Sequence, residues 1–328
     1  MIKPGDIFPK MSFDLSSNKK AQEYLGLRRA KEIEIQEINA DLVIVEVLSV
    51  YCVSCMSQTA YDKELYAMIE ENKSTAGKVK MIGIAVGNNL REVSRFVDEF
   101  EVPYPVFTDF KFLKYDQIGQ VRTPFKIFLL KESDQKYYVI RTEVGLREDV
   151  KKTFGTIVSM LDGKYSIDQK QDMDATKIAS IEQGVVDDLL KEWLSQKGES
   201  LVIKKLFIES GMTVFEIGRK KQFAVLINRV SICDVCKEVQ FIYIIDSLGN
   251  VVDLLPIHLS KLYNERFNDE DIKKIRGLII SRNVRENIPF NPGVDAVTSA
   301  TITSSLLNDS INKGAQIYDL LLEKGLIQ

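Results

Sequence analysis

A pair of cysteines at the junction between a predicted strand and a predicted helix constrains the fold more than any other feature of the sequence. Residues 41–50, DLVIVEVLSV, are mostly β-branched or apolar, which is typical of a strand buried inside a sheet. Cys52 and Cys55 follow, and residues 56–72 carry apolar side chains at near-helical spacing. A Cys-x-x-Cys pair between a buried strand and a helix strongly indicates a redox site.

Strands and helices continue to alternate after this pair, which favours an α/β sandwich. We therefore expect an α/β domain over residues 1–161. Residues 162–185 are polar and poorly periodic, and we expect them to link two domains. The further strands are predicted at residues 78–87, 104–109, 123–130 and 136–145, and the further helices at residues 89–101 and 147–161.

A domain of a different kind is predicted over residues 186–328. Its strands are bounded by turn signals, and DSLGN at residues 246–250 fits a hairpin. Helices are predicted at residues 268–279 and from about Ser304 to Lys324, so this half is expected to be α+β. The apolar stripe of the last helix comprises Leu307, Ile311, Ala315, Tyr318 and Leu322.

The composition excludes several classes of function. The chain has 328 residues, of which 45% are hydrophobic and 28% charged, and this fits a globular protein of two domains. A net charge of −3 gives no reason to expect a nucleic-acid partner. No apolar run approaches the roughly 18 residues of a membrane span, and no signal peptide is visible. The single histidine, His258, rules out a His-rich metal site and reads as an ordinary polar residue near a strand end.

The first domain resembles the thioredoxin-like superfamily over about residues 4–160. GDIFPKMSF near the N-terminus resembles the opening of the extracytoplasmic thioredoxin-like and peroxiredoxin-like branches, and VIVEVLSVYCVSC resembles their strand and active-site segment. VRTPFKIFLL resembles the Thr-Pro turn of the family. The resemblance implies that Thr123 precedes a cis proline, Pro124, which faces the cysteine pair.

The chemistry expected of the first pair is thiol–disulfide exchange. Cys52 lies at a helix N-terminus, where unpaired N–H groups and the helix dipole would lower its pKa and favour the nucleophilic thiolate. Cys55, one turn further, would resolve the mixed disulfide. Glu46 stands where many thioredoxins hold a buried acid, and it could pass a proton to or from Cys55. The other interpretation of Glu46 is a polar residue tolerated at a strand edge.

Two departures from the family leave the direction of the reaction open. Tyr51 replaces the usual tryptophan, and Val-Ser replaces the usual Gly-Pro between the cysteines. A peroxiredoxin needs a proline and a threonine before its cysteine, and here Ser49 could replace the threonine but Val45 occupies the proline position. A purely structural disulfide is a further alternative.

A second motif, VDAVTSATITSS, precedes the C-terminal helix. A cluster of serine and threonine before a helix normally serves capping. The spacing Asp-x-x-Thr-Ser-Ala-Thr also resembles the flavinylation motif of FMN-binding domains, as in the C and G subunits of the sodium-pumping NADH:quinone reductase and Rnf-type complexes. The resemblance covers roughly residues 190–325. It implies that a flavin transferase joins FMN to Thr301 through a phosphodiester. The other residues of the motif are Asp295, Thr298, Ser299, which stands where the family usually has glycine, and Ala300.

The chemistry of a phosphodiester agrees with this placement. It keeps a negative charge, and a helix N-terminus offers it unpaired N–H groups. Thr303, Ser304 and Ser305 could add hydroxyl donors or cap the helix, and the small Ala300 would let the backbone approach. Asp295 could bind the metal used during flavin transfer, or hold the loop.

The second cysteine pair, Cys233 and Cys236, lies between two predicted strands, where no helix dipole would activate it. Lys237 takes the place of the histidine of a haem-attachment motif, which makes c-type haem an unfavourable interpretation. A four-cysteine zinc site with the first pair is a weak alternative. The two main interpretations are a disulfide that only staples a hairpin and a redox-active dithiol beside the flavin.

Together these features suggest a flavin-linked thiol–disulfide oxidoreductase. Electrons would pass between FMN, the Cys233/Cys236 dithiol and the Cys52/Cys55 pair, and the partner would be a thiol or disulfide protein. One alternative is a flavoprotein electron carrier that docks to a membrane redox complex, with largely structural cysteines. Another is a binding module without redox activity. Both resemblances imply an extracytoplasmic location if a leader is missing from this sequence, and a cytoplasmic location is the alternative.

Overall fold

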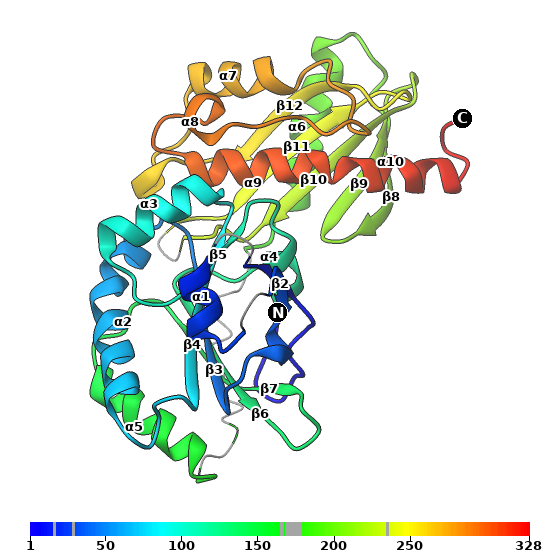
Figure 1. Cartoon of the computed structure of the whole chain (residues 1–328). Coiled ribbons are helices and arrows are strands. Elements are labelled where there is room, and N and C mark those ends of the chain that lie inside the picture. Colours follow the sequence, from blue (N-terminus) through cyan, green and yellow to red (C-terminus); the bar gives the residue numbers. More distant parts are fainter. Residues whose placement is uncertain (16–17, 28–29, 165–166, 168–178, 234–235) are drawn as a thin grey trace. The chain divides into compact units, whose positions relative to one another are not determined.

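The chain divides into two compact units, and Figure 1 shows the elements of both. The expected linker, residues 162–185, falls largely outside the described residues. The first unit comprises Met1–Thr176 with Ile232–Asp234, and the second comprises Lys177–Ser231 with Val235–Gln328. The computed structural model describes all residues except 16–17, 28–29, 165–166, 168–178 and 234–235.

A five-stranded mixed sheet forms the centre of the first unit. β3 (Leu42–Leu48) lies in the middle and is buried along its whole length, as its apolar run predicts. It pairs in parallel with β4 (Val79–Val86), which pairs in parallel with β5 (Val106–Asp109). On its other side it pairs antiparallel with β6 (Phe125–Lys131), which pairs antiparallel with β7 (Tyr137–Val144). All five strands lie where the sequence predicts them.

Helices cover this sheet. α2 (Val53–Glu71) and α5 (Val150–Leu161) pack together and share one hydrophobic core with β3, β4, β6 and β7. α3 (Leu90–Phe100) contacts β5. The predicted alternation of strands and helices in the first part of the chain is therefore confirmed.

Short elements complete the first unit, and the sequence does not predict them. They have only three to six residues, which is too short for a hydrophobic period to show. β1 and β2 pair antiparallel as a separate two-stranded sheet. These elements are β1 (Ser12–Asp14), α1 (Lys19–Tyr24), β2 (Glu32–Glu34), the 3-10 turn η1 (Ile35–Glu37) and α4 (Leu113–Ile118).

The second unit contains a five-stranded antiparallel sheet in which neighbours in sequence are neighbours in space. The predicted DSLGN hairpin joins its last two strands. The strands are β8 (Ile203–Glu209), β9 (Met212–Ile217), β10 (Gln222–Arg229), β11 (Val239–Ile245) and β12 (Val251–His258). His258 is thus the last residue of a strand, as the sequence suggests.

Helices pack on this sheet, which makes the second unit α+β. α6 (Gln183–Gln196) packs on it and was not predicted, although its buried side chains recur at the helical period. α9 (Thr301–Asn312) contacts β11, and α7 contacts β12. The other helical elements are α7 (Asp269–Ile279), α8 (Pro292–Asp295), α10 (Gly314–Glu323) and the 3-10 turn η3 (Leu262–Asn264).

The prediction of one C-terminal helix from Ser304 is wrong in two respects. α9 begins three residues earlier, and the chain breaks between α9 and α10. A Cβ atom on Gly314 would lie 2.8 Å from the hydroxyl of Tyr243, so this position leaves no room for a side chain. The predicted apolar stripe is also wrong at its end, because Leu321 is buried while the predicted Leu322 is 41% exposed. Among the residues that the structure describes, no helix combines the length and the apolarity that a membrane span requires.

Candidate functional site

The first cysteine pair is positioned by the loop between β3 and α2. Cys52 is the N-cap residue of α2, and its sulfur accepts a hydrogen bond from the Cys55 amide at 3.4 Å. The loop is fixed from inside, because the Cys52 amide donates to the Ser49 carbonyl at 3.0 Å and the Val50 amide donates to Oδ1 of Asn88 at 3.0 Å. Cys52 is 0% exposed and Cys55 is 3% exposed, so both thiols are buried.

The Thr-Pro turn lies directly against this pair. The peptide bond between Thr123 and Pro124 is cis, and β6 begins at the next residue. The Cys52 thiol donates a hydrogen bond to the Thr123 carbonyl at 3.5 Å. The structure therefore brings together four of the residues that the sequence assigns to the redox site.

A short segment that includes the first cysteine of the second pair belongs to the same unit. The Thr123 amide donates to the Ile232 carbonyl at 2.5 Å, and Thr123 forms a parallel bridge with Cys233. The Arg122 guanidinium donates to the Cys233 carbonyl at 3.2 Å. Cys233 is buried and Cys236 is half-buried.

The thiol of Cys233 changes the titration of Cys52. Hydrogen bonding to the Cys233 thiol, hydrogen bonding to Cys55 and burial raise the pKa of Cys52 above its ordinary value. The expectation of a lowered pKa is therefore wrong for this arrangement, because a buried thiol with thiol neighbours keeps its proton more readily. The helix N-terminus still favours the thiolate, since the Cys55 amide points at the sulfur.

Three buried charged groups lie between α2 and the sheet. Glu46 in β3 faces Lys126 across the strand pair, with 2.7 Å between Oε2 and Nζ. Oδ1 of Asp62, from α2, is 2.8 Å from the same Nζ. The side chains of Glu46 and Lys126 are each only 2% exposed. Because β3 is the central strand, the interpretation of Glu46 as a strand-edge residue is wrong.

Burial controls the titration of this triad of Glu46, Lys126 and Asp62. Burial raises the pKa of Glu46 to about 8, although the Lys126 ammonium opposes the rise. Burial also raises the pKa of Asp62 against the same ammonium. For Lys126, burial lowers the pKa but the two carboxylates outweigh it and leave the pKa raised. Asp62 and Lys126 were not predicted from the sequence, although a lone lysine in an apolar strand indicates a buried partner.

The threonine of the second motif stands at the beginning of α9. Thr301 is the first residue of that helix and is half-buried, and no side chain caps the helix N-terminus. Ala300, the N-cap residue, is buried, whereas Thr298 and Ser299 are exposed. Ser299 has φ of 59°, in the left-handed region that favours glycine, which explains physically why glycine would suit this position.

The other hydroxyls of the motif hold the loop rather than cap the helix. The Thr303 hydroxyl donates to the Ser260 carbonyl at 2.7 Å, and Oγ of Ser304 accepts from the Val297 amide at 3.1 Å. Both side chains and that of Ser305 are buried. The expectation that these three residues cap the helix is therefore wrong, and their burial does not favour a role as phosphate donors.

The loop before α9 is also held by its acidic and basic side chains. Oδ2 of Asp295 accepts from the Asn291 amide at 2.7 Å, which is the loop-holding role considered for this residue. Lys274, from α7, donates to the carbonyls of Val294 and Ala296 at 3.0 and 2.7 Å. The role of Lys274 was not predicted from the sequence. A half-buried hydroxyl beside an uncapped helix N-terminus fits the phosphate end of an FMN group.

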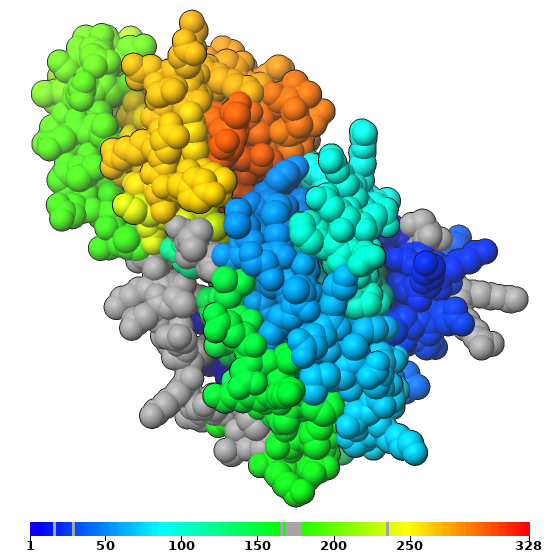
Figure 2. Space-filling model, turned by 90° about the vertical axis from the view of Figure 1, so that its left-hand side faces the viewer, coloured from blue at the N-terminus to red at the C-terminus, as the bar shows by residue number. Residues whose placement is uncertain are grey.

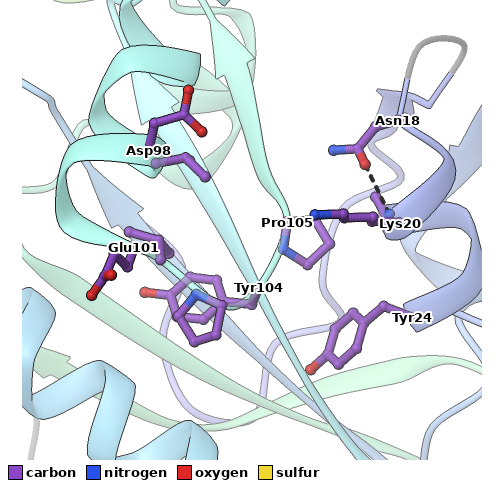
Figure 3. Close-up of a pocket in the computed structure, with 11 residues that line it drawn as sticks. Asn18, Lys20, Tyr24, Asp98, Glu101, Tyr104 and Pro105 are labelled. Atoms are coloured by element: carbon purple, nitrogen blue, oxygen red, sulfur yellow. Dashed lines mark hydrogen bonds between the residues drawn. The ribbon is translucent and has the colours of Figure 1, made fainter.

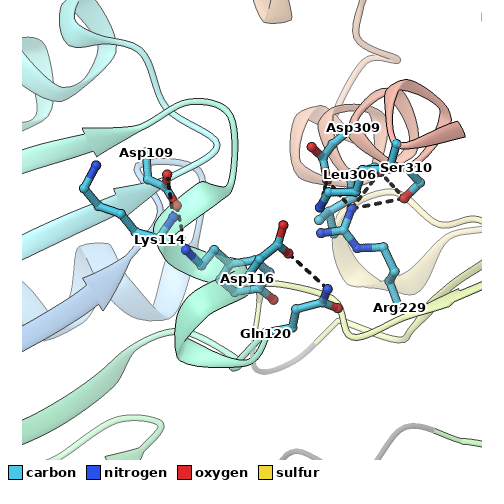
Figure 4. A network of polar contacts seen from close by, with 10 residues as sticks. Asp109, Lys114, Asp116, Gln120, Arg229, Leu306, Asp309 and Ser310 are labelled. Carbon is cyan, nitrogen blue, oxygen red and sulfur yellow. Dashed lines mark hydrogen bonds and ion pairs between the residues drawn. The ribbon is translucent and has the colours of Figure 1, made fainter. Parts of the chain in front are cut away.

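Within the second unit, the end of β10 is fastened to α9. Nη1 of Arg229 lies 2.5 Å from Oδ2 of Asp309 and donates to Oγ of Ser310 at 3.1 Å, as Figure 4 shows. Nζ of Lys313 lies 2.7 Å from the same Asp309 oxygen. The strand that leads towards Cys233 is thus tied to the helix that begins at Thr301.

A cavity of about 460 Å³ lies elsewhere in the first unit, between α1 and the end of α3 (Figure 3). Its lining includes Tyr24, Tyr104, Pro105 and Asp98, and none of the predicted site residues. In the part of the chain that the structure describes, no group of three or more His, Cys, Asp or Glu side chains could hold a metal ion.

Comparisons with solved structures find similar proteins over about half of the chain. The thioredoxin domain of a thiol-disulfide oxidoreductase from Bacteroides vulgatus is 14% identical with a TM-score of 0.37, and the match covers 48% of this chain and 99% of that one. A secreted disulfide oxidoreductase from Mycobacterium tuberculosis is 11% identical with a TM-score of 0.32, covering 40% and 90%. Peroxidoxin BcpB from the same organism is 12% identical with a TM-score of 0.36, covering 51% and 100%. No protein-family model and no curated protein matches the sequence.

Proposed function

We propose that this protein is a thiol–disulfide oxidoreductase in which Cys52 is the nucleophile and Cys55 the resolving cysteine. The observation that carries the proposal is the position of Cys52, which caps α2, accepts the Cys55 amide and contacts Thr123. In the reaction, the Cys52 thiolate attacks a disulfide of a protein substrate or redox partner, and Cys55 then displaces that partner. Substrate binding must free Cys52 from its present neighbours, because it is buried.

The buried triad supports a proton-transfer role. Cys55 must lose a proton when it resolves the mixed disulfide, and a group that titrates near neutral pH is suited to accept it. Burial gives Glu46 a pKa of about 8, and the ammonium of Lys126 holds that carboxyl in place. We assign the proton to Glu46 for this reason.

We further propose that FMN is attached covalently to Thr301 by a flavin transferase. Support comes from the half-buried position of Thr301 at the start of α9, the missing side-chain cap and the small Ala300. When bound, FMN would supply two-electron exchange with a dithiol. The dithiol assigned to this role is Cys233/Cys236, which would in turn exchange with Cys52/Cys55. We place the action outside the cytoplasm, in line with both sequence resemblances.

The second candidate is a flavoprotein electron carrier that docks to a membrane redox complex. The complete burial of Cys52 favours it, because a reactive thiol usually needs access to its partner. The two candidates differ in whether Cys52 is needed for turnover of a disulfide.

Reduction of insulin disulfides, with dithiothreitol as the electron donor, tests the first proposal. We expect loss of activity in Cys52→Ser and retained activity in the matched control Cys233→Ser/Cys236→Ser, which removes the other pair. An unchanged rate in Cys52→Ser would contradict a thiol–disulfide oxidoreductase and favour the carrier.

Intact mass after co-expression with a flavin transferase tests the flavin proposal. We expect a covalent FMN adduct on the unaltered protein and on the control Ser195→Ala, which removes an exposed hydroxyl of α6 outside the motif, and its loss in Thr301→Ala. An adduct that survives in Thr301→Ala, or no adduct on any of the three proteins, would refute attachment at Thr301.

A further inference from the structure

A stretch of the loop between β10 and β11 pairs with the Thr-Pro turn as an added strand would. Thr123 and Cys233 form a parallel bridge, and the Thr123 amide donates to the Ile232 carbonyl at 2.5 Å. The Thr123 hydroxyl donates to the same carbonyl at 2.9 Å. The Arg122 guanidinium donates to the Cys233 carbonyl at 3.2 Å. Main-chain pairing of this kind is a common way to recognise an extended peptide.

The nucleophile of the proposed reaction lies at the same point. The Cys52 thiol donates to the Thr123 carbonyl at 3.5 Å, so the residue that pairs with Cys233 also contacts Cys52. The neighbouring Cys233 thiol raises the pKa of the Cys52 thiol, as do Cys55 and burial. Cys233 is only 1% exposed, whereas Cys236 is half-buried and three residues further along.

We propose that Ile232 and Cys233 form a built-in substrate strand, which presents the sulfur of Cys233 to Cys52 for disulfide exchange within one chain. This inference rests on the proposed function and deepens it, because it names the internal partner and the sulfur that is attacked. Arg122 and Thr123 are positioning residues, since they hold the backbone of the strand and not its sulfur.

The exchange balances within the chain. Starting from a Cys233–Cys236 disulfide, the Cys52 thiolate bonds to the Cys233 sulfur, the bond between Cys233 and Cys236 breaks, and Cys236 leaves as a thiolate that takes up a proton. Cys55 then loses its proton and bonds to the Cys52 sulfur, and Cys233 leaves and takes up a proton. Two electrons pass from Cys52/Cys55 to Cys233/Cys236, and the reverse direction uses the same steps.

The strand also controls access to Cys52. Its Ile232 carbonyl already accepts the Thr123 amide, and the Cys52 thiol beside Thr123 is 0% exposed. A disulfide from another protein must therefore displace the strand before it can reach Cys52. Removing the Arg122 guanidinium should expose Cys52, because the strand then loses the charge-assisted hydrogen bond to its Cys233 carbonyl.

Two double variants test which sulfur is attacked. Cys55→Ser/Cys236→Ser leaves Cys52 and Cys233, and the matched control Cys55→Ser/Cys233→Ser leaves Cys52 and Cys236. With oxidised glutathione as oxidant, which is reduced to two thiols, peptide mapping follows the new intramolecular disulfide. We expect the first variant to form it ~10-fold faster or more, at a rate independent of protein concentration. Equal rates in the two variants, or only disulfides between two chains, would overturn the inference.

Alkylation of Cys52 by iodoacetamide gives an independent readout. We expect Arg122→Ala to raise its rate by ~10-fold, whereas the control Arg95→Ala, an exposed residue of α3, leaves it unchanged. An unchanged rate in Arg122→Ala would contradict the positioning role of Arg122.

Insulin reduction separates failure of this inference from failure of the proposed function. If Cys233→Ser/Cys236→Ser still reduces insulin but Cys55→Ser/Cys236→Ser forms no bond between Cys52 and Cys233, the oxidoreductase stands and the built-in strand is refuted. If that variant and the unaltered protein are both inactive towards insulin, the oxidoreductase proposal itself fails.

Discussion

Two helices of this protein begin at residues to which we assign covalent chemistry, and their N-termini are built differently. At α2 the reactive atom is itself the cap, because the Cys52 sulfur accepts the Cys55 amide. At α9 no side chain caps the helix, and Thr301 stands half-buried in its first turn. A sulfur that must change its charge gains from a donor in place, whereas a hydroxyl that is to be esterified needs open space beside it.

The polar groups that surround the N-termini of α2 and α9 also differ. Behind α2 lies the buried triad of Glu46, Lys126 and Asp62, which contains three titratable groups. Around α9 the contacts of Thr303 and Ser304 are hydrogen bonds of neutral hydroxyls with the backbone. The first region therefore places three buried titratable groups behind its reactive sulfur, whereas Thr303 and Ser304 hold the second region through neutral hydrogen bonds. Four predictions test this contrast, beginning with the largest expected effect.

Removing the cation of the triad should cost the most stability. We expect Lys126→Met to lower the free energy of unfolding by about 3–5 kcal/mol, because it leaves two buried carboxyl groups without their partner. Urea denaturation of the full chain measures the loss. The control Lys63→Met removes an exposed ion pair with Glu101 and should change little. Similar effects of the two substitutions would show that the triad contributes no more than a surface pair.

The pKa of Glu46 predicts a stability that falls as the pH rises. Burial raises this pKa from 4.5 to about 8, so the folded state holds a proton that the unfolded state has lost. Stability is therefore complete below the unfolded pKa and is lost as the pH rises through the folded pKa. Between about pH 5.5 and about pH 7.5 the loss should be roughly 3 kcal/mol, because one proton corresponds to about 1.4 kcal/mol per pH unit.

The variant Glu46→Gln should flatten this pH dependence, since glutamine does not titrate. Unfolding by urea at several pH values gives both curves. The raised pKa of Asp62 has the same sign and would leave a smaller residual slope. Equal slopes in the two proteins would show that Glu46 is ionised in the folded state throughout this range.

The hydroxyl groups around α9 should contribute less to the free energy of unfolding than the buried triad does. We expect Ser304→Ala to lower the free energy of unfolding by about 1–2 kcal/mol, because the amide of the buried Val297 loses its acceptor. Thr301→Ala is the control, because its half-buried hydroxyl caps nothing, and it should leave the stability of the flavin-free protein unchanged. If both variants lose the same amount, the loop-holding role of Ser304 is wrong.

The sequence predicts those parts of the site that depend on local pattern. An apolar run and a Cys-x-x-Cys pair are enough to place β3 and the start of α2, because both features lie within about 15 residues. Asp62 could also have been predicted from the sequence, because it follows Cys55 by seven residues, which is two turns along the same helix face. Lys126 required knowing that β6 pairs with β3, which the strand sequences alone do not specify.

Other parts of the site depend on contacts that leave no periodic signal. Cys233 meets Thr123 through main-chain groups more than a hundred residues apart in sequence, within an irregular loop. The side chain of Tyr243 lies close to Gly314, where the chain passes from α9 to α10. Both contacts join residues far apart in sequence, so a local pattern of side chains does not predict them.

The smallest expected effect concerns the turn that leads into α9. Ser299 has φ of 59°, a conformation that costs a residue with a side chain about 1 kcal/mol relative to glycine. Glycine also makes the unfolded chain more flexible, which offsets part of this gain. We therefore expect Ser299→Gly to raise the free energy of unfolding by about 0.5 kcal/mol. Thr298→Gly, at the exposed neighbour without positive φ, should lower it by a similar amount, because glycine gains nothing there. A loss of stability in Ser299→Gly as large as that in Thr298→Gly would show that the serine conformation is not strained, and the turn into α9 would then place no demand on this residue.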